Sequence, residues 1–353
     1  MNIRKILTGT VAAVALGFVG AAGVSNDASA QSVEWSMAST YPGSLTQLGT
    51  LGKRIEEQIA LVSGGDMEIR FYEPGALMPA LEVFDAVSIG AVEAGWSTPG
   101  YWIGTEPALA LFGAVPFGPA APEYIAWFYF GGGKELMDEI YARYGIKSVI
   151  CGVIAPEASG WFRTPIESTA DLEGLVMRFF GLGARVMERM GVSTQLLAGG
   201  DIFPALELGT IDATEFSMPA IDLNLGFYQV ASHYYLPGWH QQSTLFDLMM
   251  NLDLWNELSP SQQAQIESVC GDNVRYAIAE GEAIQFAAMQ ELVDQHGVTI
   301  HQWSDEVLDE LRAAWADEVA ELTAGDRTFA RVWESLSTFR ENYAIWGERG
   351  YLN

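Results

Sequence analysis

An alternation of strand-forming and helix-forming segments over residues 33–98 constrains the fold of this chain more than any other feature. Three segments are typical of strands: residues 33–40, 67–73 and 92–98. Two segments between them are typical of helices: residues 44–62 and 81–89. This order predicts parallel strands that are joined by crossover helices. We therefore expect an α/β protein.

The same alternation returns over residues 176–216 and predicts a second α/β unit. Strand-forming residues 146–153 precede this unit, and strand-forming residues 245–250 would return the chain to the first one. A chain that crosses twice between two units forms a hinge, as in proteins that close around a solute. The expected fold is a two-domain, periplasmic-binding-protein-like clamp with a double-crossover hinge and long C-terminal helices.

The first thirty residues have the pattern of a cleavable secretory signal peptide. Arg4 and Lys5 precede an apolar stretch over residues 6–24, and the small residues Ala28, Ser29 and Ala30 follow it. We expect export to the periplasm; an uncleaved membrane anchor is the alternative.

The expected segments are a signal peptide over residues 1–30, domain I over 31–154 plus about 245–295, domain II over 155–244 plus about 296–325, and a C-terminal helical extension over about 326–353.

The chain is strongly acidic, with 45 Asp and Glu residues against 18 Lys and Arg residues and a net charge of −27. A surface of this charge repels phosphate backbones and anionic lipids. We therefore expect no nucleic-acid or membrane-surface partner. Capture of a small anion would have to depend on local positive charge.

Two cysteines, Cys151 and Cys270, are present. Export would permit a disulfide between them. Cys151 ends a strand-like segment and Cys270 lies in a helical one, so the sequence does not show whether their Cα atoms approach each other. A disulfide and two buried free thiols both stay open.

Arg178 stands inside an otherwise apolar run over residues 175–181, where a guanidinium is costly to bury without an anion. Its partner would be either a ligand anion or a carboxylate of the same domain. Glu215 ends another short strand-like segment, over residues 211–216. A cation and an anion in comparable positions suggest a polar pocket.

Other candidate residues follow strands or flank the domain crossings. Tyr101 follows the third strand, at the end where open α/β sheets bind ligands. Glu157 lies between a strand and an aromatic turn, where an isolated acid is usually a surface carboxylate. No H-E-x-x-H or G-x-S-x-G motif is present, and the four histidines form no metal-binding pair in the sequence. We expect no enzyme; the alternative is a secreted hydrolase with Glu157 and Glu215 as a carboxylate dyad.

Several motifs resemble those of one transport family. They are Trp-Phe-Arg at 161–163, Gly-Leu-Val-Met-Arg at 174–178, the segment 199–216 (GGDIFPALELGTIDATEF) and Tyr-Tyr-Leu-Pro-Gly-Trp at 234–239. The chain resembles the solute-binding subunits of tripartite ATP-independent periplasmic (TRAP) transporters, the DctP family. It is most similar to the branch that binds 2-oxo acids such as pyruvate. The resemblance covers essentially all of the chain after residue 30.

The resemblance implies roles for individual residues. Arg178 would bind the solute carboxylate. A sodium or calcium ion would bridge solute and protein through Glu157, Glu215 and the backbone carbonyl of Phe216. Where this chain has Glu157 the branch usually has glutamine, and a second carboxylate favours calcium over sodium. Tyr101, Phe216 and Trp239 would form aromatic walls.

The resemblance also implies partners. The solute would be a small carboxylate, a 2-oxo or 2-hydroxy monocarboxylate, with dicarboxylates and aromatic acids as alternatives. Membrane subunits of a TRAP transporter would receive it. The branch forms homodimers through long C-terminal helices. Two alternatives are therefore open for the apolar stripe over residues 308–322: burial against the domains, or a dimer interface.

Overall fold

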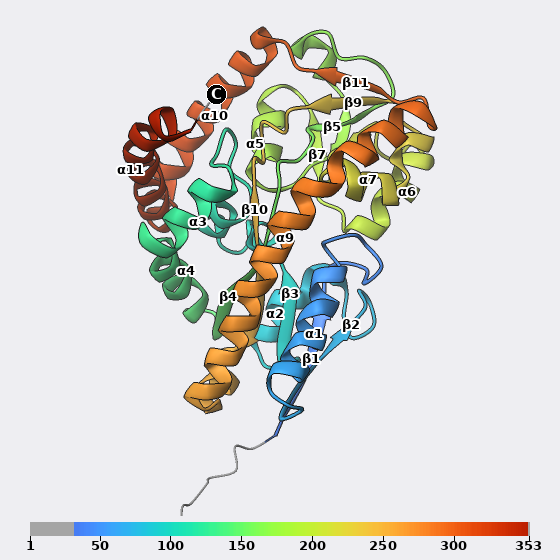
Figure 1. Ribbon diagram of the computed structural model, residues 1–353. Coiled ribbons are helices and arrows are strands. Elements are labelled where there is room, and N and C mark those ends of the chain that lie inside the picture. The colour runs from blue at the N-terminus through green and yellow to red at the C-terminus, as the bar shows by residue number, and fades with distance from the viewer. Residues whose placement is uncertain (1–31, 352–353) are drawn as a thin grey trace, which may run out of the picture. The chain divides into compact units, whose positions relative to one another are not determined.

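The computed structural model describes residues 32–351 of the chain (Figure 1). The signal peptide expected over residues 1–30 lies outside this range. Among the helices described, none combines the length and the apolar character needed to cross a bilayer.

The first sheet has five strands in the order β2-β1-β3-β10-β4. Their bounds are β1 Val33–Ser39, β2 Met67–Tyr72, β3 Ala94–Ser97, β4 Ile146–Ile154 and β10 Thr244–Asn251. β1 pairs in parallel with β2 and β3, which confirms the predicted crossovers. β10 lies antiparallel between β3 and β4, which confirms that the chain returns to this sheet.

The helices that pack against this sheet do so through apolar faces. The helical segments are α1 Thr50–Val62, η1 Ala80–Glu82, α2 Val83–Ser88, η2 Pro99–Trp102, η3 Pro107–Phe112, α3 Ala121–Phe130 and α4 Gly133–Ala142. In α1 the buried residues Leu51, Ile55 and Ile59 recur every four positions. Gly132 adopts a φ of 91° between α3 and α4, which ends one helix and starts the next.

The first helix is shorter than its sequence pattern predicts. It was expected over residues 44–62, but it begins at Thr50. Residues before it form turns, in which Gln47 has a φ of 57°. The buried Gln47 side chain donates a hydrogen bond to the carbonyl of Ala277, at 2.9 Å. This distant contact is not visible in the local sequence.

The second sheet has six strands in the order β11-β9-β5-β8-β6-β7. Their bounds are β5 Gly160–Phe162, β6 Val176–Arg178, β7 Ser193–Gln195, β8 Ala213–Thr214, β9 His233–Leu236 and β11 Thr299–Gln302. Helical segments η4 Thr169–Leu172, α5 Gly181–Arg189, α6 Gly199–Glu207, α7 Pro219–Leu225 and η5 Phe227–Gln229 connect them. β6 and β8 are parallel neighbours, so their carboxyl ends lie at the same edge.

Four helices make up most of the C-terminal third: α8 Leu252–Glu257, α9 Pro260–Asp294, α10 Asp305–Gly325 and α11 Arg327–Gly350. Ser259 and Gln262 form a capping box that starts α9. α9, orange in Figure 1, packs against β4 and α1 and also against α7. In α10, Leu311 and Trp315 are buried, so this part of the apolar stripe contributes to the core.

A disulfide joins Cys151 on β4 to Cys270 on α9, with their Cα atoms 4.1 Å apart. The question that the sequence left open is therefore answered in favour of the bridge. The two cysteines are 119 residues apart in the chain. Closing so long a loop removes much conformational freedom from the unfolded chain.

The disulfide is expected to stabilise the folded chain without affecting the site. The double variant Cys151→Ser, Cys270→Ser should lose roughly 2 to 5 kcal/mol of unfolding free energy in urea titrations. Solute affinity should stay unchanged, and a reductant should lower the stability of the unmodified protein but not that of the variant. Equal urea midpoints for the two proteins would show that the bridge contributes nothing.

Candidate functional site

A small cavity of about 260 Å³ lies where residues of both sheets meet. Its lining includes Tyr101, Glu157, Arg178 and Phe216 from the predicted site, together with Tyr41, Leu48, Thr98, Phe180, Gln241, Thr244 and Phe246. A larger pocket of about 1070 Å³ is lined by Glu73 and Asp201 and by no basic side chain. Of these two cavities, only the smaller one offers a cationic side chain, Arg178, to a small anion.

Arg178 ends β6 and is 1% exposed. Its Nη1 donates to Glu215, at 2.6 Å to Oε1 and 2.9 Å to the backbone carbonyl. Its Nε donates to the carbonyl of Leu197 at 3.3 Å. Within residues 32–351, Nη2 makes no hydrogen bond. The ion pair with a domain carboxylate is therefore present, and Nη2 is left to donate hydrogen bonds to a ligand.

Glu215 directly follows β8 and is fully buried. Its Oε1 accepts hydrogen bonds from Arg178 and from the backbone N–H of Phe180, at 2.6 Å each. Burial acts to raise the pKa of Glu215, but Arg178, His240 and the backbone N–H of Phe180 together outweigh it and hold that pKa below its usual value. Its other oxygen, Oε2, is buried and has no hydrogen-bond partner in the described part of the chain.

Glu157 lies between β4 and β5, where the chain first crosses between the sheets. It is 2% exposed, so the expectation that an acid at this position is a surface carboxylate is wrong. Oε1 accepts from the hydroxyl of Ser217 at 3.1 Å, whereas Oε2 is buried and has no hydrogen bond from residues 32–351. Burial raises the pKa of Glu157 well above that of a solvated carboxyl.

A buried carboxylate holds Ser217 in place. Asp222 on α7 accepts hydrogen bonds from Trp161 and Tyr234, at 2.9 Å each, and from the N–H of Ser217 at 3.1 Å. The carbonyl of Ser217 accepts from the N–H of Ala158 at 3.1 Å. Ser217 therefore fixes the segment that carries Glu215 and Phe216 relative to the one that carries Glu157.

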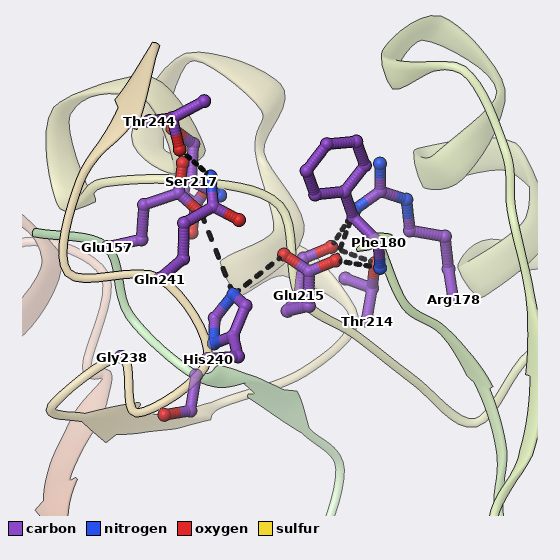
Figure 2. Close-up of polar contacts among 12 residues, drawn as sticks. Glu157, Arg178, Phe180, Thr214, Glu215, Ser217, Gly238, His240, Gln241 and Thr244 are labelled. Carbon is purple, nitrogen blue, oxygen red and sulfur yellow. Dashed lines mark hydrogen bonds and ion pairs between the residues drawn. The ribbon is translucent and has the colours of Figure 1, made fainter. Parts of the chain in front are cut away.

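His240 is the site residue that the sequence did not reveal. It lies between β9 and β10, where the chain crosses back, and is fully buried. Its Nε2 lies 3.3 Å from Oε2 of Glu215 and 3.7 Å from Oε2 of Glu157 (Figure 2). Burial acts to lower the pKa of His240, but contacts with the two carboxylates outweigh it and raise that pKa to about 9.

The two crossings are close neighbours, and this proximity, which no local sequence pattern shows, brings His240 to the site. The N–H of Glu157 donates to the carbonyl of Gln241 at 3.2 Å. A Cβ atom on Gly238 would lie 2.3 Å from the carbonyl oxygen of Glu157, so only glycine allows this approach. Residues at matching positions of two crossings therefore face each other.

The aromatic residues have different positions. The rings of Tyr41 and Tyr101 lie 6.0 Å apart, and burial raises the pKa of both, so each keeps a hydroxyl proton to donate. The guanidinium of Arg178 lies over the ring of Phe216, with Cζ 5.2 Å from the ring centroid. Trp239 is buried behind the cavity, with its ring 5.6 Å from that of His240. It supports the site rather than forming its wall.

The donor atoms fit a metal ion. Glu157, Glu215 and His240 each offer an atom within 4.8 Å of the others, and all three residues are buried. The two free carboxylate oxygens have no hydrogen bond within residues 32–351, and buried polar atoms without partners are costly. Carboxylate oxygens are preferred ligands of hard cations. A cation here would satisfy both oxygens.

Comparisons with known proteins identify the family that this chain resembles. Residues 37–326 match the family model for bacterial extracellular solute-binding protein, family 7 (DctP). The chain is 34% identical to a monocarboxylate 2-oxoacid-binding periplasmic protein of Nostoc sp. strain PCC 7120, over 100% of this chain and 96% of that protein.

Two solved structures share the fold. A TRAP transporter solute-binding protein from Bordetella bronchiseptica, a dimer with copurified calcium and picolinate in one site, is 35% identical, with a TM-score of 0.87 over 89% of this chain and 94% of that one. One from Pseudoalteromonas atlantica, with bound sodium and pyruvate, is 31% identical, with a TM-score of 0.86 over 89% of this chain and 95% of that one.

These matches confirm the predicted family and the two-domain clamp. Members of the family are solute-binding proteins of transporters and not enzymes, so the hydrolase alternative is excluded. The family model covers most of the chain, and the Nostoc relative matches all of it. The chain belongs to the DctP family of extracytoplasmic solute-binding proteins, which serve TRAP transporters.

Proposed function

We propose that this protein captures a short 2-oxo or 2-hydroxy monocarboxylate through Arg178 and a bridging metal ion. The observation that carries the proposal is the buried guanidinium of Arg178 on the wall of a small cavity, beside two carboxylates that each have one free oxygen. The Nostoc relative is named for monocarboxylate 2-oxo acids, and the Pseudoalteromonas structure holds pyruvate.

The charges in the cavity explain why a metal ion is needed. Glu157 and Glu215 are both buried, and when His240 is neutral Arg178 offsets only one of them. A solute carboxylate would add a further negative charge in a medium of low dielectric constant. A divalent ion would bring the total close to zero, whereas sodium would leave a negative excess. Calcium is therefore favoured over sodium, with Glu157, Glu215 and the carbonyl of Phe216 as ligands.

The 2-oxo or 2-hydroxy group gives the solute a second oxygen near its carboxylate. Two such oxygens can chelate the ion while the carboxylate also receives a hydrogen bond from Nη2 of Arg178. Tyr41 and Tyr101 keep hydroxyl protons that can serve as further donors. Dicarboxylates and aromatic acids are the alternative solutes.

Delivery of the solute would involve domain closure, membrane subunits and a second copy of the chain. We infer that domain I (31–154 and about 245–295) and domain II (155–244 and about 296–325) close around the solute. After removal of a signal peptide over residues 1–30, the protein would act in the periplasm and deliver the solute to TRAP membrane subunits. A homodimer through the C-terminal helices is supported by the dimeric Bordetella structure and by the exposed Ile345 and Trp346 on α11.

Arg178→Lys should weaken solute binding, because one ammonium cannot bond Leu197, Glu215 and the solute in the same geometry. We expect a loss of about 2 kcal/mol or more, which is about 30-fold in Kd by calorimetry. Arg178→Ala is a poorer test because it would leave Glu215 buried without its cation. Arg163→Lys is the matched control, since Arg163 bonds backbone carbonyls away from the cavity. An unchanged Kd for Arg178→Lys would exclude this arginine as the anchor.

A thermal-shift screen over carboxylates and neutral sugars should identify the solute class. Short 2-oxo and 2-hydroxy monocarboxylates should raise the melting temperature most, because a ligand stabilises the folded state to which it binds. Larger shifts with dicarboxylates or aromatic acids would support the alternative solutes. Stabilisation by sugars alone would contradict the carboxylate proposal.

Glu157→Gln should reduce the preference for calcium, because the neutral amide removes one charge from the ligand set. In chelator-treated protein we expect the ratio of calcium to sodium affinity to fall by about tenfold or more, equal to about 1.4 kcal/mol, with some solute binding retained. Glu318→Gln is the matched control: Glu318 is also a buried acid, but it pairs with Arg189 on another helix. Equal solute affinity with and without metal would refute the metal linkage itself.

A further inference from the structure

His240 is placed as a ligand would be, rather than as a wall of the cavity. Its Nε2 faces the Oε2 atoms of both Glu157 and Glu215, the two carboxylate oxygens that have no hydrogen bond within residues 32–351 (Figure 2). The other oxygen of each carboxylate is already held, by Ser217 in one case and by Arg178 and Phe180 in the other. Each acid therefore directs one free oxygen towards the same imidazole nitrogen.

The distances among these atoms suit a shared ion. Two ligand atoms about 2.1 Å from one ion and at right angles lie about 3 Å apart, and at tetrahedral angles about 3.4 Å apart. The observed separations from Nε2 are 3.3 Å and 3.7 Å. To present a lone pair at Nε2, the ring must carry its proton on Nδ1, which is buried and has no hydrogen-bond acceptor in the described range.

We propose that His240 is a third side-chain ligand and that the site consequently binds zinc, or a first-row transition ion such as Mn²⁺, more tightly than calcium. This inference rests on the metal-linked capture proposed above and goes beyond the calcium and sodium of the related structures. The reason is the donor set. Calcium takes oxygen ligands, whereas an imidazole nitrogen beside two carboxylates suits first-row transition ions and zinc.

A different arrangement would use the same three side chains without a metal. A protonated His240 could itself serve as the cation between the two carboxylates. The two arrangements have opposite consequences for a variant without the imidazole. Removing a ligand weakens the binding of zinc and manganese, whereas removing a competing cation strengthens the binding of every metal ion.

The test is calorimetric titration of chelator-treated protein with the chlorides of zinc, manganese and calcium, without solute. His233→Asn, His301→Asn is the background for all proteins, because these two histidines lie 2.9 Å apart on β9 and β11 and can bind zinc themselves. His240→Asn is compared with that background. His240→Gln is a second variant, and thermal unfolding checks that each one folds.

We expect the background protein to bind zinc and manganese at least about 100-fold more tightly than calcium. His240→Asn should lose about 100-fold in zinc affinity and less than about threefold in calcium affinity. The visible spectrum of bound Co²⁺ should also change in His240→Asn, because this spectrum depends on whether a nitrogen atom is among the ligands.

Three outcomes would overturn the inference. Unchanged zinc affinity in His240→Asn would mean that the imidazole is not a ligand. Tighter binding of all three ions in that variant would identify His240 as a competing cation. Calcium binding that exceeds zinc and manganese binding would refute the preference but leave metal-linked capture intact, whereas binding of no ion at all would refute both.

Discussion

The buried ion pair between Arg178 and Glu215 is the interaction on which the rest of the site depends. The two residues lie at the carboxyl ends of neighbouring parallel strands, β6 and β8, so the sheet itself places them together. The pair is costly to desolvate and is a weak source of stability by itself. Its value lies in placement: it fixes a guanidinium at a cavity wall and leaves one carboxylate oxygen free for a cation.

The two chain crossings complete the site. Glu157 belongs to the first crossing and His240 to the second, and a backbone hydrogen bond from Glu157 to Gln241 holds the crossings side by side. Asp222 and Ser217 tie Glu157 to the strand that carries Glu215. Because two of the proposed ligands come from segments that connect the two sheets, a bound ion would also restrain the relative position of those sheets.

The sequence predicted the features that depend on local pattern. Strand and helix alternation gave the parallel order of β1, β2 and β3, and the cost of an arginine in an apolar run identified Arg178. The role proposed for Glu157 came only from the family resemblance, since an isolated acid is usually solvated. Features set by distant contacts could not be predicted. The late start of α1 depends on a contact between Gln47 and Ala277, and His240 has its partners in two other segments. The disulfide required a distance that no local pattern contains.

The central claim is that Arg178 and a metal ion at Glu157 and Glu215 together hold a small carboxylate. The most direct test is a crystal structure of the protein grown with pyruvate and calcium, with anomalous data to locate the ion. The account predicts a solute carboxylate against the guanidinium of Arg178, and an ion bound to both acids and to an oxygen of the solute. Pyruvate bound away from Arg178, or bound there with no ion between the two acids, would contradict it.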